Sequence, residues 1–146
     1  MGRTRTKIVQ GEEAKIKSET AKTKKSKKKK YVDFGIFYIN ATFNNTLMCF
    51  TDKKGNVLAW SSAGHCGFKN TKKATPYAGA KTAELLINKV KSNFDIGEVK
   101  IIVKGIGPGR ESALRALFNE DFNITAIEDR TPIPFGGPTP PKPRRV

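Results

Sequence analysis

The segment 64–76, GHCGFKNTKKATP, brings together residue types that can bind the phosphates and bases of a nucleic acid. Its lysines can neutralise phosphates, its amide and hydroxyl groups can form hydrogen bonds, and its phenylalanine can stack on an unpaired base. Thr75 and Pro76 are typical of a helix start, where free backbone N–H groups attract phosphate. The same composition also suits an ordinary solvated loop. The candidate RNA-binding residues here are Phe68, Lys69, Asn70, Thr71, Lys72, Lys73 and Thr75.

A second candidate site is the glycine-rich segment 105–112, GIGPGRES. Gly107 and Gly109 let the backbone approach a phosphate closely, and Arg110 adds a planar fork of donors. The segment lacks the GK[ST] ending of a Walker A loop and reads GxGxG rather than GxGxxG, which disfavours a nucleotide site. The alternative is a structural role in a tight turn. If Gly107 has a positive φ, a β-branched residue there would strain that turn.

Metal binding and catalysis are poorly supported by the other polar residues. His65 and Cys66 are adjacent and Cys49 lies in a segment expected to be a buried strand, so the ligand spacing of a structural zinc site is missing. The acids that a two-metal nuclease would need are scattered along the chain. These acids are Asp33, Asp52, Glu84 and Asp129. We expect a protein that is not an enzyme and has no metal or cofactor.

The 146-residue chain carries 28 Lys and Arg against 13 Asp and Glu, and the excess positive charge is concentrated at its two ends. Residues 1–30 hold 12 basic and 3 acidic residues, and residues 130–146 hold 4 basic and no acidic ones. We expect a disordered basic extension over 1–30, a globular domain over 31–130 and an extended, proline-rich basic tail over 131–146. The tail is also compatible with a PxxP peptide ligand. Its candidate RNA-binding residues are Lys142, Arg144 and Arg145.

The composition also limits the class of partner. No apolar run approaches the ~20 residues of a transmembrane helix, and the start of the chain lacks the apolar stretch of a signal peptide. Two cysteines make no disulfide framework, which suits a reducing cytosol. A lipid surface is disfavoured because no basic amphipathic helix with aromatic anchors is evident. Nucleic acid is the favoured partner, and we expect no membrane or small-molecule partner.

The strands that must position these sites follow from the hydrophobic pattern. They are expected over 31–42, 46–51, 57–63, 99–104 and 123–128, with a hairpin turn at 52–56. The second half of the first strand carries apolar residues on both faces, so we expect it to be buried on both.

Two helices are expected between these strands. The first begins at Thr75 and Pro76 and ends near Asn93, and small residues near its start favour close packing on the sheet. The second follows the turn 105–109, with Leu114, Leu117 and Phe118 on one face. The order β-β-β-α-β-α-β predicts a single α/β domain, with a mixed sheet of about five strands and two helices packed on it.

Six stretches, in the right order, closely resemble the small-subunit ribosomal protein S eleven family in its bacterial or organellar form. They are INATFNNT (39–46), TDKKGN (51–56), WSSAGHCGFKNTKKATPYA (60–78), VKGIGPGRESALRAL (103–117), DRTPIPFGG (129–137) and PPKPRRV (140–146). The resemblance covers residues 31–146. One such stretch is a modest indication, whereas six in order are very specific.

The resemblance implies a ribonuclease-H-like α/β fold without catalytic function, in a structural protein of the small ribosomal subunit. It implies a place on the platform near the mRNA exit and the E site, with 16S-type rRNA contacted through the loop matching 67–75 and the tail matching 131–146. The implied neighbours are the seventh, eighteenth and, in bacteria, twenty-first small-subunit proteins. The implied location is the ribosome of the cytoplasm or of an organelle. A free nucleic-acid-binding module and a metal-dependent nuclease on the same fold are the alternatives.

The chain departs from the family pattern in three places. Residues 1–30 show no family pattern, and His65 and Cys66 stand where the family usually has small residues. In the tail, residues 135–139 and Pro143 differ from the usual sequence, so two cations are missing. The lysine-rich extension is the feature that could compensate for them.

Overall fold

The computed structural model describes residues 29–142, which contain five strands, two α-helices and one short 3-10 helix. The elements are β1 (Lys30–Ala41), β2 (Thr46–Asp52), β3 (Val57–Ser62), η1 (Asn70–Ala74), α2 (Pro76–Asn93), β4 (Phe94–Lys104), α3 (Gly109–Phe118) and β5 (Asn123–Asp129). This order confirms the β-β-β-α-β-α-β succession, and with it the predicted α/β class.

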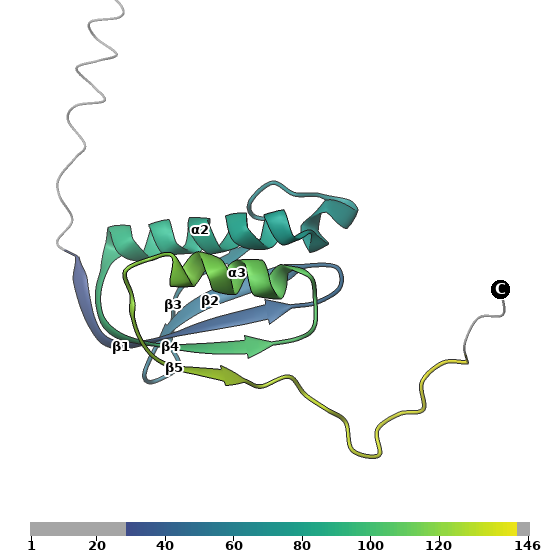
Figure 1. The fold of residues 1–146 in the computed structure, drawn as a ribbon. Coiled ribbons are helices and arrows are strands. Elements are labelled where there is room, and N and C mark those ends of the chain that lie inside the picture. Colours follow the sequence, from purple (N-terminus) through teal and green to yellow (C-terminus); the bar gives the residue numbers. More distant parts are fainter. Residues whose placement is uncertain (1–28, 143–146) are drawn as a thin grey trace, which may run out of the picture.

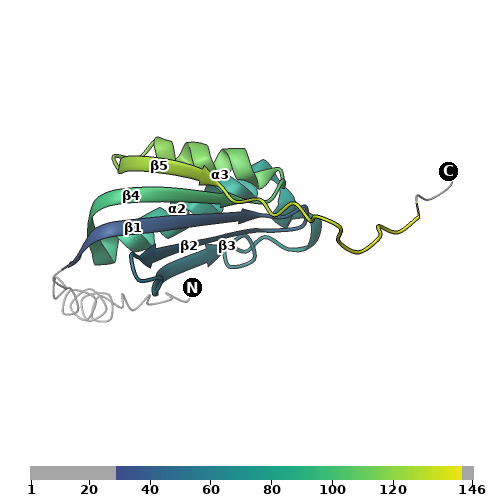
Figure 2. The same ribbon diagram turned by 90° about the horizontal axis from the view of Figure 1, so that it is seen from below.

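The five strands form one mixed sheet in the order β3-β2-β1-β4-β5, with β1 at its centre (Figure 2). β1 pairs with β2 in antiparallel fashion and with β4 in parallel, and β4 pairs in parallel with β5. The β2–β3 hairpin closes through a turn in which Asp52 accepts hydrogen bonds from the backbone N–H groups of Lys54 and Asn56. Because β1, β4 and β5 run the same way, their carboxyl ends lie at one end of the sheet.

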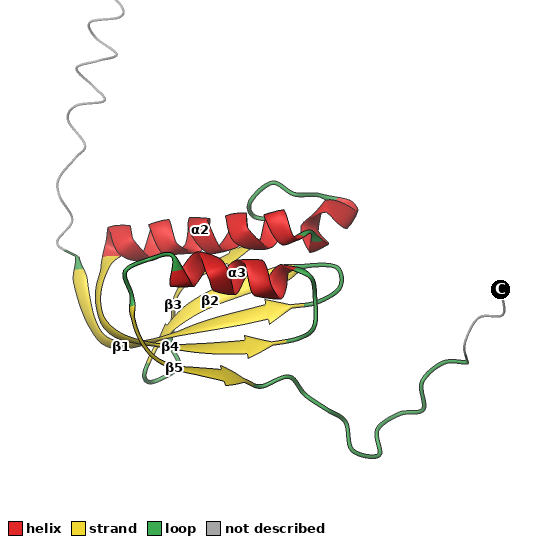
Figure 3. Cartoon of the chain, viewed as in Figure 1, coloured by secondary structure: helices red, strands yellow, loops and turns green. Residues whose placement is uncertain are grey.

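Both α-helices cover the same face of the sheet, and the core lies between the two layers (Figures 1 and 3). Phe37, Phe50 and Ile101 come from adjacent strands and are fully buried. From the helices, Leu86, Ile87 and Leu117 are buried against this layer. Alternation along each strand therefore selects the residues that face the helices.

Within residues 29–142, no helix covers the other face of the sheet, and this corrects one expectation. Phe37 and Ile39 are fully buried beneath the helices, but Ile36 and Tyr38, which point the other way, are only half-buried. The expectation that the second half of β1 is buried on both faces was wrong. Its apolar pattern misled because Ile and Tyr also suit the half-covered face of a sheet.

The start of α2 is capped as its sequence predicts. The Thr75 hydroxyl accepts a hydrogen bond from the backbone N–H of Ala78 at 3.2 Å, and Pro76 occupies the first helical position. The small residues here serve helix–helix packing as well as packing on the sheet. A Cβ at Gly79 would lie 2.6 Å from the backbone oxygen of Gly109, so the two helices meet where neither residue has a side chain.

Three further details differ from the sequence expectations. β4 begins at Phe94 rather than at 99, directly after α2. The loop before α2 contains the short helix η1. On α3, Phe118 is exposed rather than on the buried face, and Ala113 and Leu117 are the apolar side chains that are fully buried. Neither α-helix of residues 29–142 is long and apolar enough to cross a membrane.

Candidate nucleic-acid interface

The predicted site segments lie at one end of the molecule, where β1, β4 and β5 end and where α2 and α3 begin (Figure 1). The loop 63–75 enters α2 there, the turn 105–108 enters α3, and the tail leaves after β5. Segments far apart in the sequence are thus brought to one surface. The topology alone explains this, because the carboxyl ends of parallel strands face the same way.

The loop 63–75 presents most of its predicted polar residues to solvent. Lys69, Asn70, Thr71 and Lys72 are exposed, whereas Lys73 is half-buried. Asn70 has φ +50, so η1 begins from a left-handed backbone residue. Among residues 29–142, Lys69 and Lys72 form no ion pair with a carboxylate, so their ammonium groups are free to bind phosphate.

Two residues of this loop have additional structural roles. Phe68 is half-buried and packs edge-on against Tyr77, with ring centroids 5.8 Å apart. The Thr75 hydroxyl donates to the Lys72 carbonyl oxygen at 2.9 Å while it caps α2. A base can therefore reach Tyr77, which is exposed, more easily than Phe68.

The glycines of the turn 105–109 fit closely against the segment that joins β1 to β2. Gly107 donates its N–H to the Ala41 carbonyl oxygen at 2.9 Å. A Cβ at Gly107 would lie 2.2 Å from the Thr42 carbonyl oxygen, and one at Gly109 would lie 2.2 Å from the Thr46 hydroxyl oxygen. The positive φ in this turn belongs to Gly105, at +91°, and not to Gly107. Gly107 and Gly109 are thus buried and serve packing within the protein.

Arg110 joins the turn to the start of the tail. Its Nη1 donates to the Gly105 carbonyl oxygen at 2.8 Å and to the Thr131 hydroxyl at 3.3 Å, and its Nη2 donates to Asp129 Oδ2 at 2.7 Å. Thr131 in turn donates both its backbone N–H and its hydroxyl to Asp129 Oδ1. We call Gly105, Arg110, Asp129 and Thr131 the clasp. Both Nη1 and Nη2 of Arg110 therefore donate hydrogen bonds within the protein, which leaves fewer of its donors for a phosphate.

The clasp holds the pKa of the Asp129 carboxyl well below its usual range. The largest cause is the hydrogen bond from Arg110, followed by those from Thr131. A carboxyl with a lowered pKa in the folded state binds a proton more weakly there than in the unfolded chain. The clasp therefore stabilises the fold fully at neutral pH, and this contribution is lost as the pH falls below the carboxyl's ordinary value.

We expect Asp129→Asn to reduce the acid sensitivity of the fold. The variant should show a smaller difference between its melting temperatures at pH 7 and pH 3 than the parent chain. Asp121→Asn is the matched control, because the Asp121 carboxylate accepts no hydrogen bond from residues 29–142 in the structure. Equal acid sensitivity of Asp129→Asn and the parent would show that the clasp does not stabilise the fold.

The tail leaves the domain at the clasp and runs away from it in an extended form (Figure 1). Residues 132–142 are exposed, Lys142 among them. Arg144 and Arg145 lie outside the described residues, as do residues 1–28 of the predicted extension. The exposure of Lys142 is compatible with its predicted role in binding phosphate.

The structure adds residues at this end that the sequence interpretation did not assign to a site. Phe43 and Ile106 are each 67% exposed, and Asn44 and Lys104 are exposed beside them along the chain. Thr42 and Asn45 form a tight turn through two backbone-to-side-chain hydrogen bonds and one backbone hydrogen bond, which holds Phe43 outward. A large apolar side chain at the tip of a fixed turn was the available signal.

The polar residues considered for metal binding are not brought together in the part of the chain that the structure describes. Within residues 29–142, no three His, Cys, Asp or Glu side chains are close enough to hold a metal ion. His65 is exposed, as expected. Cys49 was expected in the core, but it is half-buried on the helix-free face, and its partial burial raises the pKa of its thiol. That expectation was wrong because β2 has a core on only one side.

A small α/β domain that gathers a lysine-rich loop and a cationic tail at one end is typical of a nucleic-acid-binding protein. Comparison with known proteins defines the family. Residues 35–145 match the family model of ribosomal protein S11. The chain is 47% identical over 123 residues to small ribosomal subunit protein uS11 of Coprothermobacter proteolyticus, covering 84% of this chain and 98% of that protein. It is 44% identical over 130 residues to the protein of the same name from Chromobacterium violaceum, covering 89% of this chain and 98% of the relative. The chain belongs to the ribosomal protein S11 family.

Proposed function

We propose that this chain is a structural constituent of the small ribosomal subunit and binds small-subunit rRNA. The observation that carries the proposal is the family match over residues 35–145, together with relatives named as small ribosomal subunit proteins. The geometry supports it independently, because the loop 63–75, the turn 105–108 and the tail meet at one end. The exposed Lys69 and Lys72 are the loop cations that we assign to phosphate contacts.

In this proposal, each of the three parts of the chain makes a different kind of contact with rRNA. We assign the domain 31–130 to shape-dependent contacts with folded rRNA, and the tail 131–146, with Lys142, Arg144 and Arg145, to a narrow path between rRNA segments. The extension 1–30 supplies 12 basic residues for neutralising phosphates. In this proposal the protein sits on the platform of the subunit, borders the exit path of the mRNA near the E site, and has the seventh, eighteenth and twenty-first small-subunit proteins as neighbours. Its location is the ribosome of the cytoplasm.

We further propose that the protein has no enzymatic activity. The acids that a nuclease would need are far apart or already bonded to other groups of the protein. Asp52 is bonded within its own hairpin turn and Asp129 within the clasp, while Glu84 pairs with Lys81 on α2. A two-metal nuclease needs carboxylates that converge on one pair of ions. The other rival, a free nucleic-acid-binding module, differs in where the protein is found in the cell.

Salt extraction of sedimented small subunits tests this function and the loop together. A tagged full-length chain should sediment with small subunits, and Lys69→Gln/Lys72→Gln should be released at lower salt than the parent. Each lost phosphate contact lowers the slope of log K against log salt by about one unit, so we expect a decrease of up to ~2.

The matched control is Lys53→Gln/Lys54→Gln, which removes two exposed lysines from the β2–β3 turn at the other end of the sheet. It should behave like the parent. A parent chain found with bulk nucleic acid and absent from small subunits would refute the ribosomal function. Identical salt release of the two double variants would refute only the role of the loop.

A further inference from the structure

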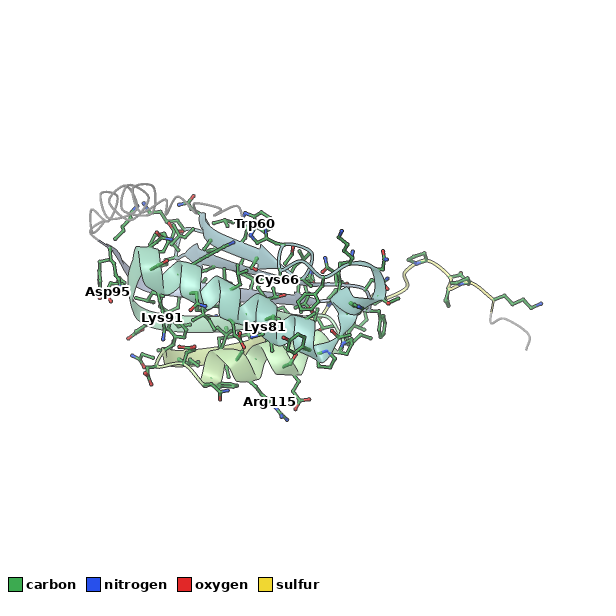
Figure 4. The ribbon with its side chains drawn as sticks, turned by 90° about the horizontal axis from the view of Figure 1, so that it is seen from above. Trp60, Cys66, Lys81, Lys91, Asp95 and Arg115 are labelled. Carbon is green, nitrogen blue, oxygen red and sulfur yellow. The ribbon has the colours of Figure 1, made fainter. Side chains whose placement is uncertain are left out.

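Trp60, His65 and Lys89 form a cluster outside the interface described above. They come from β3, from the loop that follows it, and from α2, so they are up to 29 residues apart in the sequence. The Trp60 and His65 rings are 5.3 Å apart between centroids, tilted by 50°. Figure 4 shows Trp60 and Cys66 on the side of α2 that faces β3, away from Arg115 on α3.

The ammonium group of Lys89 is held at this aromatic pair. Its Nζ lies 3.0 Å from His65 Nε2 and 3.3 Å from the Trp60 carbonyl oxygen, to which it donates. It also lies 5.9 Å from the centroid of the Trp60 ring. Among the described residues, every ion pair involves other side chains, so no carboxylate compensates the charge of Lys89. Lys81, on the same helix, differs because it is paired with Glu84.

The Trp60 ring is available to a partner. Its residue is 56% exposed, although Trp is usually well covered in folded proteins. An exposed ring with an uncompensated cation beside it matches the two parts of a nucleotide, a base that stacks and a phosphate that is negatively charged. Stacking on the ring requires an unpaired base, which points to single-stranded RNA.

A groove runs from the loop 63–75 to Lys89, one member of this cluster. It has a volume of about 610 Å³, and its lining includes Cys66, Phe68, Tyr77, Lys81, Glu84 and Lys89, whereas Trp60 and His65 lie outside it. Phe68 belongs to the loop and Lys89 to the cluster, so the groove is continuous from one to the other. Tyr77 and Lys89 are separated by about 18 Å of helix at 1.5 Å per residue. Lys81 is paired with Glu84 in this groove, so among its described lining residues Lys89 is the lysine without an ion pair. Aromatic rings along a groove that carries such a cation are typical of proteins that bind a single strand.

We propose that this surface, which we call the Trp60 platform, binds a single-stranded segment of RNA, with a base stacked on Trp60 and a flanking phosphate bound by Lys89. The site rests on the proposed rRNA-binding function and extends it to an unpaired strand on the β3 side of α2. His65 supports the platform by holding Lys89 beside the ring.

Fluorescence tests the platform directly, because Trp60 is the only tryptophan in the chain. A short oligouridylate added to the full-length protein should quench the emission of Trp60 and shield it from acrylamide. Trp60→Ala should bind labelled oligouridylate at least fivefold more weakly, since stacking on one aromatic ring contributes about 1–3 kcal/mol per base. Lys89→Gln keeps the tryptophan, and its quenching curve should shift to higher RNA concentration and lose about one unit of salt slope.

Lys54→Gln is the matched control, because it removes one exposed lysine from the β2–β3 turn. It should titrate like the parent. If labelled oligouridylate binds the parent without changing Trp60 emission, and Trp60→Ala and Lys89→Gln bind as tightly as Lys54→Gln, the platform is refuted while the rRNA-binding function stands. A parent chain that binds neither oligouridylate nor small-subunit rRNA fragments would refute both. Shielding of Trp60 by a protein neighbour in assembled subunits, with none by RNA, would also refute the platform.

Discussion

Replacing Gly107 by alanine should destabilise the fold strongly, and more than the same change at Gly64 or Gly67. The new Cβ would lie 2.2 Å from the Thr42 carbonyl oxygen and 2.6 Å from its carbonyl carbon. These are backbone atoms of the segment that joins β1 to β2, so no side-chain rotation can relieve the overlap. Overpacking costs about 1–3 kcal/mol where side chains can adjust. We therefore expect a loss of about 3 kcal/mol or more, or failure to fold.

The measurement is thermal melting followed by circular dichroism. For a domain of this size, 3 kcal/mol corresponds to roughly 12 °C or more. Two other glycines of the same chain separate the possible causes. Gly64 has no positive φ, and a Cβ there would meet no atom closer than 3.9 Å, so Gly64→Ala should stay within about 0.5 kcal/mol of the parent. Gly67 has φ +90 and open space around it, so Gly67→Ala should show a cost of about 1 kcal/mol from strain alone.

The three variants distinguish close packing from backbone strain as the reason for glycine in this turn. If Gly107→Ala has the same melting temperature as Gly64→Ala, the turn is free to move away from Thr42, and the structural role of Gly107 is refuted. If it melts at the temperature of Gly67→Ala, a small shift of the backbone relieves most of the overlap with Thr42, since Gly107 itself has no positive φ to explain the loss. The sequence interpretation linked intolerance at Gly107 to a positive φ, whereas the structure places the positive φ at Gly105 and a steric limit at Gly107.

Local pattern accounts for most of the fold. Alternating apolar residues marked β1, and the Thr75–Pro76 pair marked the first turn of α2, because each pattern reflects a local rule of burial or capping. The first half of β4 was missed for a physical reason. α2 passes into β4 at Phe94 without a turn residue between them, and the strand then includes Gly97. A Cβ at Gly97 would lie 2.6 Å from the Asp33 backbone oxygen, so this glycine marks close packing on β1 and not a loop.

The sequence predicted which residue types the candidate site contains, but not which of them contact one another. The exposure of Lys69 and Lys72 follows from their place in a polar loop. The engagement of Arg110 does not, because its partner Asp129 lies 19 residues further along the chain. The Trp60 platform was likewise hidden, since Lys89 reaches Trp60 only after α2 has folded over the sheet. Contacts of this kind depend on tertiary structure, which no local pattern reports.

The two ends of the chain should contribute differently to assembly, and the smaller charge should have the larger effect. Deleting residues 1–29 removes 11 basic and 3 acidic residues, whereas deleting residues 132–146 removes only Lys142, Arg144 and Arg145. If net charge alone decided assembly, the N-terminal deletion would be the more damaging. We expect the opposite for specific incorporation into small subunits, because the tail begins at a fixed point.

The fixed point is the clasp. Arg110 and Asp129 hold Thr131, and the prolines that follow restrict the backbone, so the tail loses less conformational entropy when it docks than an unrestricted segment would. The deletion is made after Thr131 so that the clasp and the fold are preserved. A lysine-rich extension instead contributes phosphate neutralisation that is sensitive to salt and insensitive to sequence.

Reconstitution of small subunits with each truncated chain, at low and high salt, measures the difference. The chain without residues 132–146 should be incorporated at least tenfold less at both salt concentrations. The chain without residues 1–29 should approach parental incorporation at low salt, and its rRNA affinity should depend less on salt because fewer counterions are released. A tail variant with Lys142, Arg144 and Arg145 changed to Gln separates the charge of the tail from its shape. If the tail-deleted chain is incorporated as well as the parent, the role of the tail is refuted. If the Gln variant shows the same loss as the deletion, that role belongs to the charge of the tail rather than to its restricted backbone.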